Sequence, residues 1–293
     1  MPDISKISNK KTESPFRLFW QRFRRNSPAV IGLVLLLILL LCSLAAPLLT
    51  KYDPLQQNLI EALEGPSSEH LLGTDYLGRD ILSRILYGGR LTLTIGFMAV
   101  AIGLIIGVPL GAISGYFGGW PDLLIQRLAD ILLSFPSFLL ALTLVALMGV
   151  GVRNLVISVG IIAIPSFIRL VRSAVLSIRA ELYVEAARSI GSTDWRIIFK
   201  HVLPNAMVPV IINASLNLGY AISTAAGLGF LGLGVQPPTP EWGMMLGEAK
   251  TYIFSHSYML TSPGLVIFIA IVGLNLVGDG FRDALDPRLK NIL

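Results

Sequence analysis

The sequence predicts an all-α integral membrane protein with about six transmembrane helices. Of its 293 residues, 54% are hydrophobic and only 14% are charged, whereas an average soluble domain is about 25% charged. The mean hydropathy is +0.71, and a soluble core of this size cannot bury so much apolar surface. Charge-free runs also recur along the chain, and about 20 such residues suffice for a helix to cross the hydrocarbon core.

Six stretches meet the minimum length of about 17 residues for a membrane-spanning helix. We place these spans at 29–49, 91–115, 124–149, 154–172, 205–226 and 263–281. The fourth reaches that length only if Arg169 extends its side chain to the interface. The first span could instead be a secretory signal cleaved after Ser43-Leu-Ala45. Its apolar run and basic leader are both longer than usual for a signal, so we expect an anchor.

The distribution of Lys and Arg predicts the orientation of the helices. Residues 1–28 hold seven basic and two acidic side chains, and residues 172–203 hold five basic and three acidic side chains. Residues 50–90 hold four basic and six acidic side chains, and residues 236–262 hold one basic and two acidic side chains. We therefore expect both termini and residues 172–203 in the cytoplasm, with 50–90 outside. An even number of spans gives the same topology.

The basic leader, residues 1–28, is expected to contain a short amphipathic helix. Four aromatic residues follow the spacing i, i+3, i+4, i+7, and four arginines flank that face: Phe16, Phe19, Trp20 and Phe23, with Arg17, Arg22, Arg24 and Arg25. Such a helix would lie in the headgroup plane before Pro28 turns the chain into the first span. A disordered basic tail is the alternative, and residues 1–14 are expected to be disordered.

Glycines mark two of the spans. Four of them recur at every fourth position of the second span: Gly103, Gly107, Gly111 and Gly115. They share one helical face, along which a neighbouring helix can approach closely. The run 201–240 is too long for one crossing and too short for two, and glycines interrupt its second half: Gly227, Gly229, Gly232 and Gly234. We expect one full helix followed by a broken or re-entrant segment, which membranes tolerate only inside protein or beside a cavity.

Motifs for soluble chemistry are absent from the sequence. Gly227-Leu-Gly229-Phe-Leu-Gly232 fits the dinucleotide fingerprint, and Glu248 falls near its acidic position by chance, but no βαβ pattern surrounds it. No phosphate loop or hydrolase motif occurs. Isolated histidines and a single cysteine offer no metal site or internal disulfide: His70, His201, His256 and Cys42. We expect no catalytic residue, metal or cofactor in this chain.

The loop 172–203 is expected to hold two short helices joined at a glycine. A helix-forming run from Glu181 to Ile190 meets Gly191, and good N-cap residues follow at 192–194. The small side chains at 186 and 187 would let the surface of another protein come close. Considered from these residues alone, an ordinary cytosolic hairpin remains the alternative.

This loop resembles the EAA loop of ABC importer permeases, E-A-A-x3-G followed downstream by L-P. The matching residues are Glu185, Ala186, Ala187, Gly191, Leu203 and Pro204. Further motifs resemble the dipeptide, oligopeptide and nickel permeases of this class: Leu72-Gly-Thr-Asp75-x-x-Gly78-Arg79-Asp80 with Ser83-Arg84 and Gly89-Arg90, Pro237-Pro238-x-Pro240-x-Trp242-Gly243, and the run from Asn275 to Arg288. The resemblance covers nearly the whole chain past residue 15 and is closest to the second, C-type permease of such importers.

The resemblance implies a type I importer permease fold, with a five-helix core at 91–281 and a cytoplasmic C-terminus at 282–293. It also implies a homologous second permease, an extracytoplasmic substrate-binding protein, and two ATPase subunits that dock on the EAA loops of the permeases and bind ATP and Mg. The location would be the bacterial inner membrane, and nucleic acid is no partner. Peptides are the expected substrates, and nickel or another small solute is the alternative.

Two other classes of function fit the sequence less well. A membrane enzyme or receptor would need clustered ionisable residues at bilayer depth. The candidates are Arg127, Asp130 and Arg169, which we place near the cytoplasmic ends of their spans and interpret as snorkelling or helix-end pairs. A stand-alone channel is disfavoured because a passive pore needs no extended coupling loop.

Overall fold

The computed structural model describes residues 15–285, with the side chains of residues 15 and 16 left out. Residues 1–14 and the end of the C-terminal motif, 286–293, lie outside the described residues. The described residues form helices joined by loops, and a single isolated β-bridge among them pairs Thr74 with Asp80. The main helices are α1 (Pro15–Arg25), α2 (Ser27–Leu44), α3 (Ala46–Leu49), α4 (Ile81–Phe117), α5 (Gly119–Leu133), α6 (Ser137–Met148), α7 (Val152–Ile178), α8 (Leu182–Ser189), α9 (Asp194–Ile197), α10 (Leu203–Phe230), α11 (Trp242–Ala249) and α12 (Tyr258–Leu285).

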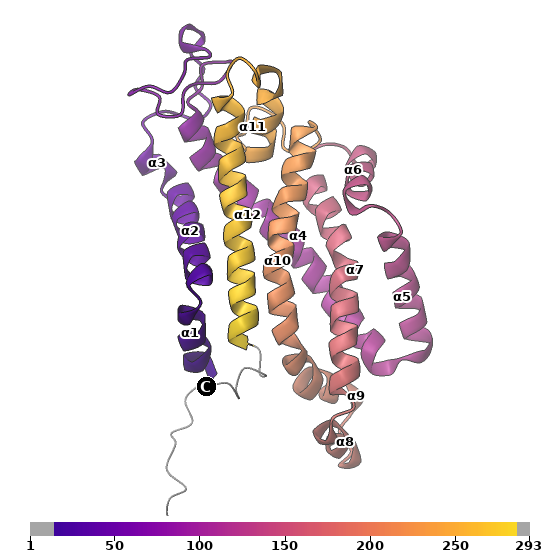
Figure 1. The fold of residues 1–293 in the computed structure, drawn as a ribbon. Coiled ribbons are helices and arrows are strands. Elements are labelled where there is room, and N and C mark those ends of the chain that lie inside the picture. Colours follow the sequence, from indigo (N-terminus) through magenta and orange to yellow (C-terminus); the bar gives the residue numbers. More distant parts are fainter. Residues whose placement is uncertain (1–14, 286–293) are drawn as a thin grey trace, which may run out of the picture.

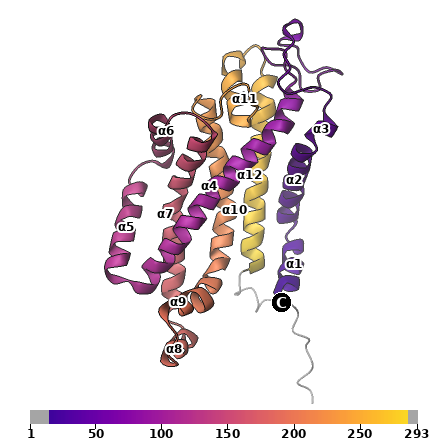
Figure 2. The ribbon, with the colours of Figure 1, turned by 180° about the vertical axis from the view of Figure 1, so that it is seen from behind.

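The long helices form one elongated bundle with two distinct ends (Figure 1). One end carries α1, α8, α9 and the last turn of α12, and we name it the α8 end. The other carries α3, α11 and the loops that follow α3, and we name it the α11 end (Figure 2). The first helix, the loop around residue 190 and the last helical turn thus share one end, while the side of the membrane that this end faces stays a prediction.

The number of apolar helices confirms the predicted fold class. Five helices of the described chain are long and apolar enough to cross a membrane: α2, α4, α7, α10 together with α9, and α12. The predicted span 124–149 is wrong as a single helix, because α5 and α6 meet at an angle of 88°. Pro136 lies at this break, where it lacks a backbone donor and disfavours helical geometry at Phe135. A sixth span exists only if this bent pair is counted as one.

Several helices extend beyond the apolar runs that predicted them. The helix expected over 91–115 begins at Ile81, where the Asp80 carboxylate caps it by accepting from the Ser83 amide at 2.7 Å. The helix α7 runs on to Ile178, and α12 begins at Tyr258. Hydropathy marks the part of a helix that lipid solvates, whereas caps and turns decide where the helix ends. The last ten residues of 50–90 are therefore helical.

The glycine stripe of α4 is closely approached by a neighbouring helix, as predicted, and that helix is α7. A Cβ atom at Gly107 would fall 2.7 Å from the Cβ of Phe167, and one at Gly111 would fall 2.7 Å from the carbonyl oxygen of Ile168. The same holds at Gly115, whose Cβ would lie 2.8 Å from the carbonyl of Arg172. This close approach makes α4 and α7 the most extensive helix pair of the bundle.

A re-entrant segment follows α10, but it starts later than predicted. Gly227 and Gly229 lie inside the helix, which continues to Phe230, and the chain turns at Gly232 with φ +79°. Gly243 then packs against Ala226, while Gly247 packs against the carbonyls of 229 and 230. Residues 231–241 therefore return along α10, so that α11 runs parallel to its last turns.

The amphipathic helix forms as α1, but its aromatic face contacts protein. Phe23 is 1% exposed and lies with Phe19 against Phe281 of α12. A Cβ at Gly280 would lie only 2.9 Å from the Phe23 ring. The phenylalanine face thus packs on the bundle instead of remaining free for lipid, whereas Trp20 stays 39% exposed.

Candidate functional site

The loop between α7 and α10 has the predicted helix–glycine–helix form. The helix α8 ends in two backbone hydrogen bonds, from Gly191 to the carbonyl of Arg188 at 3.0 Å and from Ser192 to the carbonyl of Ala187 at 3.1 Å. This pattern requires a left-handed residue after the helix, and Gly191 has φ +81°. The glycine is therefore needed for its backbone conformation, since its missing Cβ would meet open space.

Apolar side chains fasten this loop to the bundle. Val184 and Ala187 of α8 and Ile197 of α9 are buried in the main core. The chain then continues through a wider turn at Ile198–Val202 into α10. Pro204 lies in the first turn of α10, as expected for a residue that lacks an amide donor. The loop is thus a rigid extension of the spanning helices α7 and α10.

Polar contacts to Tyr116 in the last turn of α4 add a second attachment. The Tyr116 hydroxyl donates to the Asp194 carboxylate at 2.7 Å and accepts from the Arg188 guanidinium at 3.2 Å. Arg179 donates to the carbonyls of Gly115 and Tyr116 at 3.2 and 2.7 Å. Sequence reasoning missed these residues, because nothing in the sequence indicates that the end of the second span meets the loop.

The loop also presents an outward surface of mixed character. Glu185 and Ala186 are exposed, and none of the ion pairs among residues 15–285 involves Glu185. Large apolar side chains around them remain at least half exposed: Leu182, Ile190, Trp195 and Phe199. Of the other predicted site residues, Ala187 points inward, Leu203 packs against the main core and Pro204 is exposed. Charged and apolar groups left open on a rigid projection are suited to docking a protein.

The α11 end contains a buried ionic cluster that the sequence motifs did not explain. Arg79 and Arg84 are each 1% exposed. Arg79 donates to both carboxylate oxygens of Glu248 at 3.1 Å and to Asp75 at 2.6 Å. Arg84 donates to the same Glu248 carboxylate at 3.0 Å. The conspicuous charges of the motif at 72–84 therefore join the loop to α11, and Glu248 is their shared partner.

His70 forms the second part of this α11-end arrangement. Its ring nitrogens lie 2.9 Å from the Asp80 carboxylate and 3.4 Å from the Glu61 carboxylate. Burial lowers the pKa of His70, but the hydrogen bonds and charges of Asp80 and Glu61 outweigh it and leave the pKa above its ordinary value. The same Asp80 carboxylate caps α4, so the loop and the helix start are held together.

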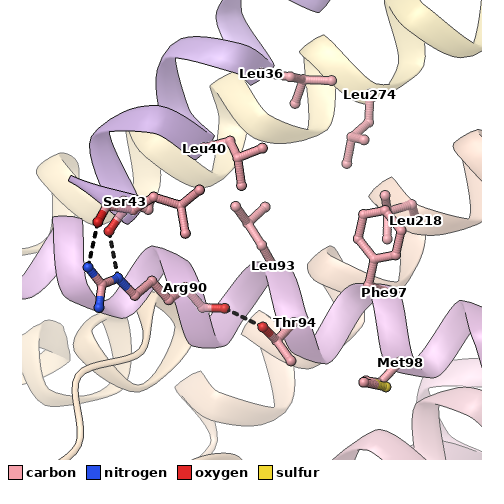
Figure 3. Close-up of a pocket in the computed structure, with 11 residues that line it drawn as sticks. Leu36, Leu40, Ser43, Arg90, Leu93, Thr94, Phe97, Met98, Leu218 and Leu274 are labelled. Carbon is pink, nitrogen blue, oxygen red and sulfur yellow. Dashed lines mark hydrogen bonds between the residues drawn. The ribbon is translucent and has the colours of Figure 1, made fainter. Parts of the chain in front are cut away.

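Between these two ends an apolar pocket opens among α2, α4, α10 and α12 (Figure 3). Its volume is about 440 Å³, and leucines from all four helices line it. Arg90 lies at its edge, where its guanidinium donates to the carbonyls of Ser43 and Leu44, each at 2.7 Å. Because that charge already bonds to carbonyls and the lining is otherwise almost wholly apolar, the pocket suits hydrocarbon better than a charged solute.

Two ion pairs join α5 to α7. Arg172 donates to Asp122 at 2.6 and 2.7 Å, and Arg169 donates to Asp130 at 2.7 Å. The structure pairs Arg169 with Asp130, and Asp130 lies toward the end of α5 that is remote from the α8 end. The bend after α5 ends that helix early, which leaves Asp130 one turn from the break. Arg127 is exposed on α5.

Comparison with known proteins places these features in context. Residues 107–291 match the family described as binding-protein-dependent transport system inner membrane component. Residues 14–66 match the N-terminal transmembrane domain of oligopeptide transport permease C.

Curated relatives are similar along nearly their whole length. A dipeptide transport system permease protein of Alkalihalophilus pseudofirmus is 47% identical, with 95% of this chain and 91% of the relative covered. A glutathione transport system permease protein of Pectobacterium atrosepticum is 46% identical, with 97% and 95% covered. Among solved structures, the inward-facing MetNI methionine ABC transporter aligns with 69% of this chain and 97% of its own, at a TM-score of 0.58 and 21% identity. This last likeness concerns the fold.

Proposed function

Because the chain belongs to the family of binding-protein-dependent transport system inner membrane components, we propose that it forms half of the translocation path of an ATP-driven peptide importer. The observation that carries the proposal is the similarity over more than nine-tenths of both chains to permeases named for dipeptides and for glutathione. Both names describe short peptides, so the substrate class proposed is the short peptide.

The proposed importer needs three kinds of partner. A homologous second permease completes the path, and an extracytoplasmic binding protein delivers peptide at the α11 end. Two ATPase subunits dock at the α8 end and bind the ATP and Mg, since this sequence has no phosphate loop. The exposed surface around Glu185 and Ala186 supports this last assignment, because it is rigidly joined to α7 and α10.

The coupling role of the loop is tested with Glu185→Lys. Inverting a charge at a protein contact can cost several kcal/mol, whereas an exposed residue with no ion pair adds little to folding. The variant should reach the membrane and pair with the second permease, yet lose the ATPase in co-purification and lose peptide uptake. Lys250→Glu, an exposed charge reversal at the other end, serves as the control for ATPase co-purification. Normal uptake by Glu185→Lys would remove the residue from the contact.

The orientation is tested with impermeant maleimide on intact cells. Single cysteines at residues 60 and 190, in a Cys42→Ser background, lie at opposite ends of the bundle, and both side chains are exposed. We expect labelling at 60 and not at 190, with both termini in the cytoplasm. Labelling of both from outside would overturn the proposed topology.

A further inference from the structure

Helix α5 ends before it is long enough to cross a membrane. Helix α5 has 15 residues, which at 1.5 Å each gives a rise of about 22 Å, less than the ~30 Å of a hydrocarbon core. Residues 134–136 after it are non-helical and exposed. The Ser134 amide and the Pro136 carbonyl keep hydrogen bonds to the neighbouring turns, but the break interrupts the helix, and membranes tolerate non-helical backbone only inside protein or beside water.

An ion pair lies one turn from this break. Arg169 and Asp130 are joined at 2.7 Å, yet their side chains remain 53% and 47% exposed. Ile168, the neighbour of Arg169, lies level with Gly111 of α4. That level is six residues, or about 9 Å, before the end of α4 at Phe117. The pair therefore sits within the depth of the charge-free run 91–121 and not at its boundary.

A second ion pair between the same helices, Arg172 with Asp122, is less exposed. The side chains of Arg172 and Asp122 are 33% and 20% exposed. Asp122 also accepts a hydrogen bond from Ser114 of α4 at 2.5 Å. Among residues 15–285, no α4 side chain bonds to Asp130 or Arg169, and a charged side chain that faces hydrocarbon is unfavourable. The face that carries Asp130 and Arg169 is thus unsuited to lipid.

We propose that Asp130 and Arg169 line the water-filled translocation path and bind the two charged ends of a peptide. The inference rests on the proposed function. The Asp130 carboxylate can accept hydrogen bonds from an α-ammonium group, and the Arg169 guanidinium can donate two to an α-carboxylate. Without peptide, the two side chains neutralise each other across 2.7 Å. A zwitterion can replace that contact with no net change of charge in the path.

The first experiment asks whether this face meets water. Ser134→Cys is a nearly isosteric change at the exposed break, made in a Cys42→Ser background and in the complete importer with its partner subunits. Ile38→Cys, 51% exposed on α2 at the opposite edge of the bundle, is the comparison. A charged thiosulfonate reagent should label position 134 at least tenfold faster than position 38. Equal, slow labelling would place the break in lipid and overturn the proposal.

The second experiment separates peptide binding from folding, with uptake of the dipeptide Ala-Ala into proteoliposomes as the readout. Arg169→Gln should lower uptake at least tenfold, while Arg153→Gln, an exposed arginine near the start of α7, should leave it unchanged. The double variant Asp130→Arg with Arg169→Asp keeps an ion pair and should therefore assemble and resist heat like the unaltered complex. It should still fail to take up peptide, because the carboxylate and the guanidinium that bind the two peptide ends have exchanged places. Full rescue of uptake by the swap would show a purely structural pair.

The outcomes also separate this inference from the function on which it rests. If the unaltered complex takes up no peptide, both the proposed substrate and the peptide-binding role fail, and the labelling rates still report whether the face meets water. If the complex takes up Ala-Ala and Arg169→Gln does so equally well, only the role of the pair is overturned.

Discussion

The two ends of the bundle use charged residues in opposite ways. At the α11 end, Arg79 and Arg84 are 1% exposed and share Glu248 within the chain. At the α8 end, Glu185 is exposed, and no ion pair among residues 15–285 uses it. Both sets of charges lie in motifs that resemble the same permease family, yet one set is satisfied internally and the other is left open. Burial therefore distinguishes a charge that holds the fold from one that is available to a partner.

The largest expected effect comes from cutting the buried cluster with Glu248→Ala. This leaves two buried guanidiniums short of their shared carboxylate, and breaking a buried ion pair costs about 3–5 kcal/mol. We expect a lower unfolding temperature in detergent and less protein in the membrane. Glu185→Ala is the matched control and should change stability by no more than about 0.5 kcal/mol. If both alanine variants lost the same stability, the proposed difference between a buried structural charge and an open one would be wrong.

A smaller effect is expected from Gly191→Val. The residue has φ +81°, and its Cβ would meet open space, so the cost is backbone strain of about 1–2 kcal/mol. Hydrogen exchange should quicken in residues 182–202. Gly232→Val is matched to it, since Gly232 has φ +79° and equally open surroundings. Both variants should lose similar stability, but only Gly191→Val should lose the ATPase in co-purification.

Tyr116→Phe tests the polar attachment of the loop and should cost about 1 kcal/mol. It removes the hydroxyl that donates to Asp194 and accepts from Arg188. Each hydrogen bond contributes roughly 0.5–1.5 kcal/mol, and the two together stay near the lower end because Asp194 and Arg188 are exposed and can bond to water instead. The loss should appear as faster hydrogen exchange in α8 and α9, with little change at the α11 end. Tyr183→Phe, which removes one 3.2 Å hydrogen bond from Asn205, is the control. Unchanged exchange in α8 and α9 of Tyr116→Phe would show that apolar packing alone fixes the loop.

The smallest effect concerns pH at the α11 end. The carboxylates of Asp80 and Glu61 hold the pKa of His70 above 6.5 although burial lowers it. The favourable contribution of the charged ring is therefore complete below pH 6.5 and is lost as pH rises through the folded-state pKa. Thermal stability should fall over that window, and His70→Gln should flatten the dependence. His256→Gln, which removes a ring bonded to Ser255, should leave it intact. A dependence that survives His70→Gln would belong to another group.

Local sequence determined the spanning helices and the turn at Gly191. Apolar runs fix which segments lipid can solvate, and a glycine after a helix fixes where the chain can adopt a positive φ. The spacing of the glycines of α4 also indicated its close-packing face, because residues four apart share one helical face, whereas only the tertiary structure shows that α7 packs there. These features depend on neighbours within a few positions of the chain.

The tertiary structure decided the rest, because it depends on residues that are distant in sequence. Hydropathy alone does not show that the span predicted at 124–149 bends by 88°, because an average over a window of residues carries no information about the angle between two helices. Nor can it show that Arg84 meets Glu248, 164 positions away, or that Tyr116 meets Asp194, 78 positions away. A buried charge needs a partner of opposite sign, but the sequence offers many, and only the packing of helices selects one.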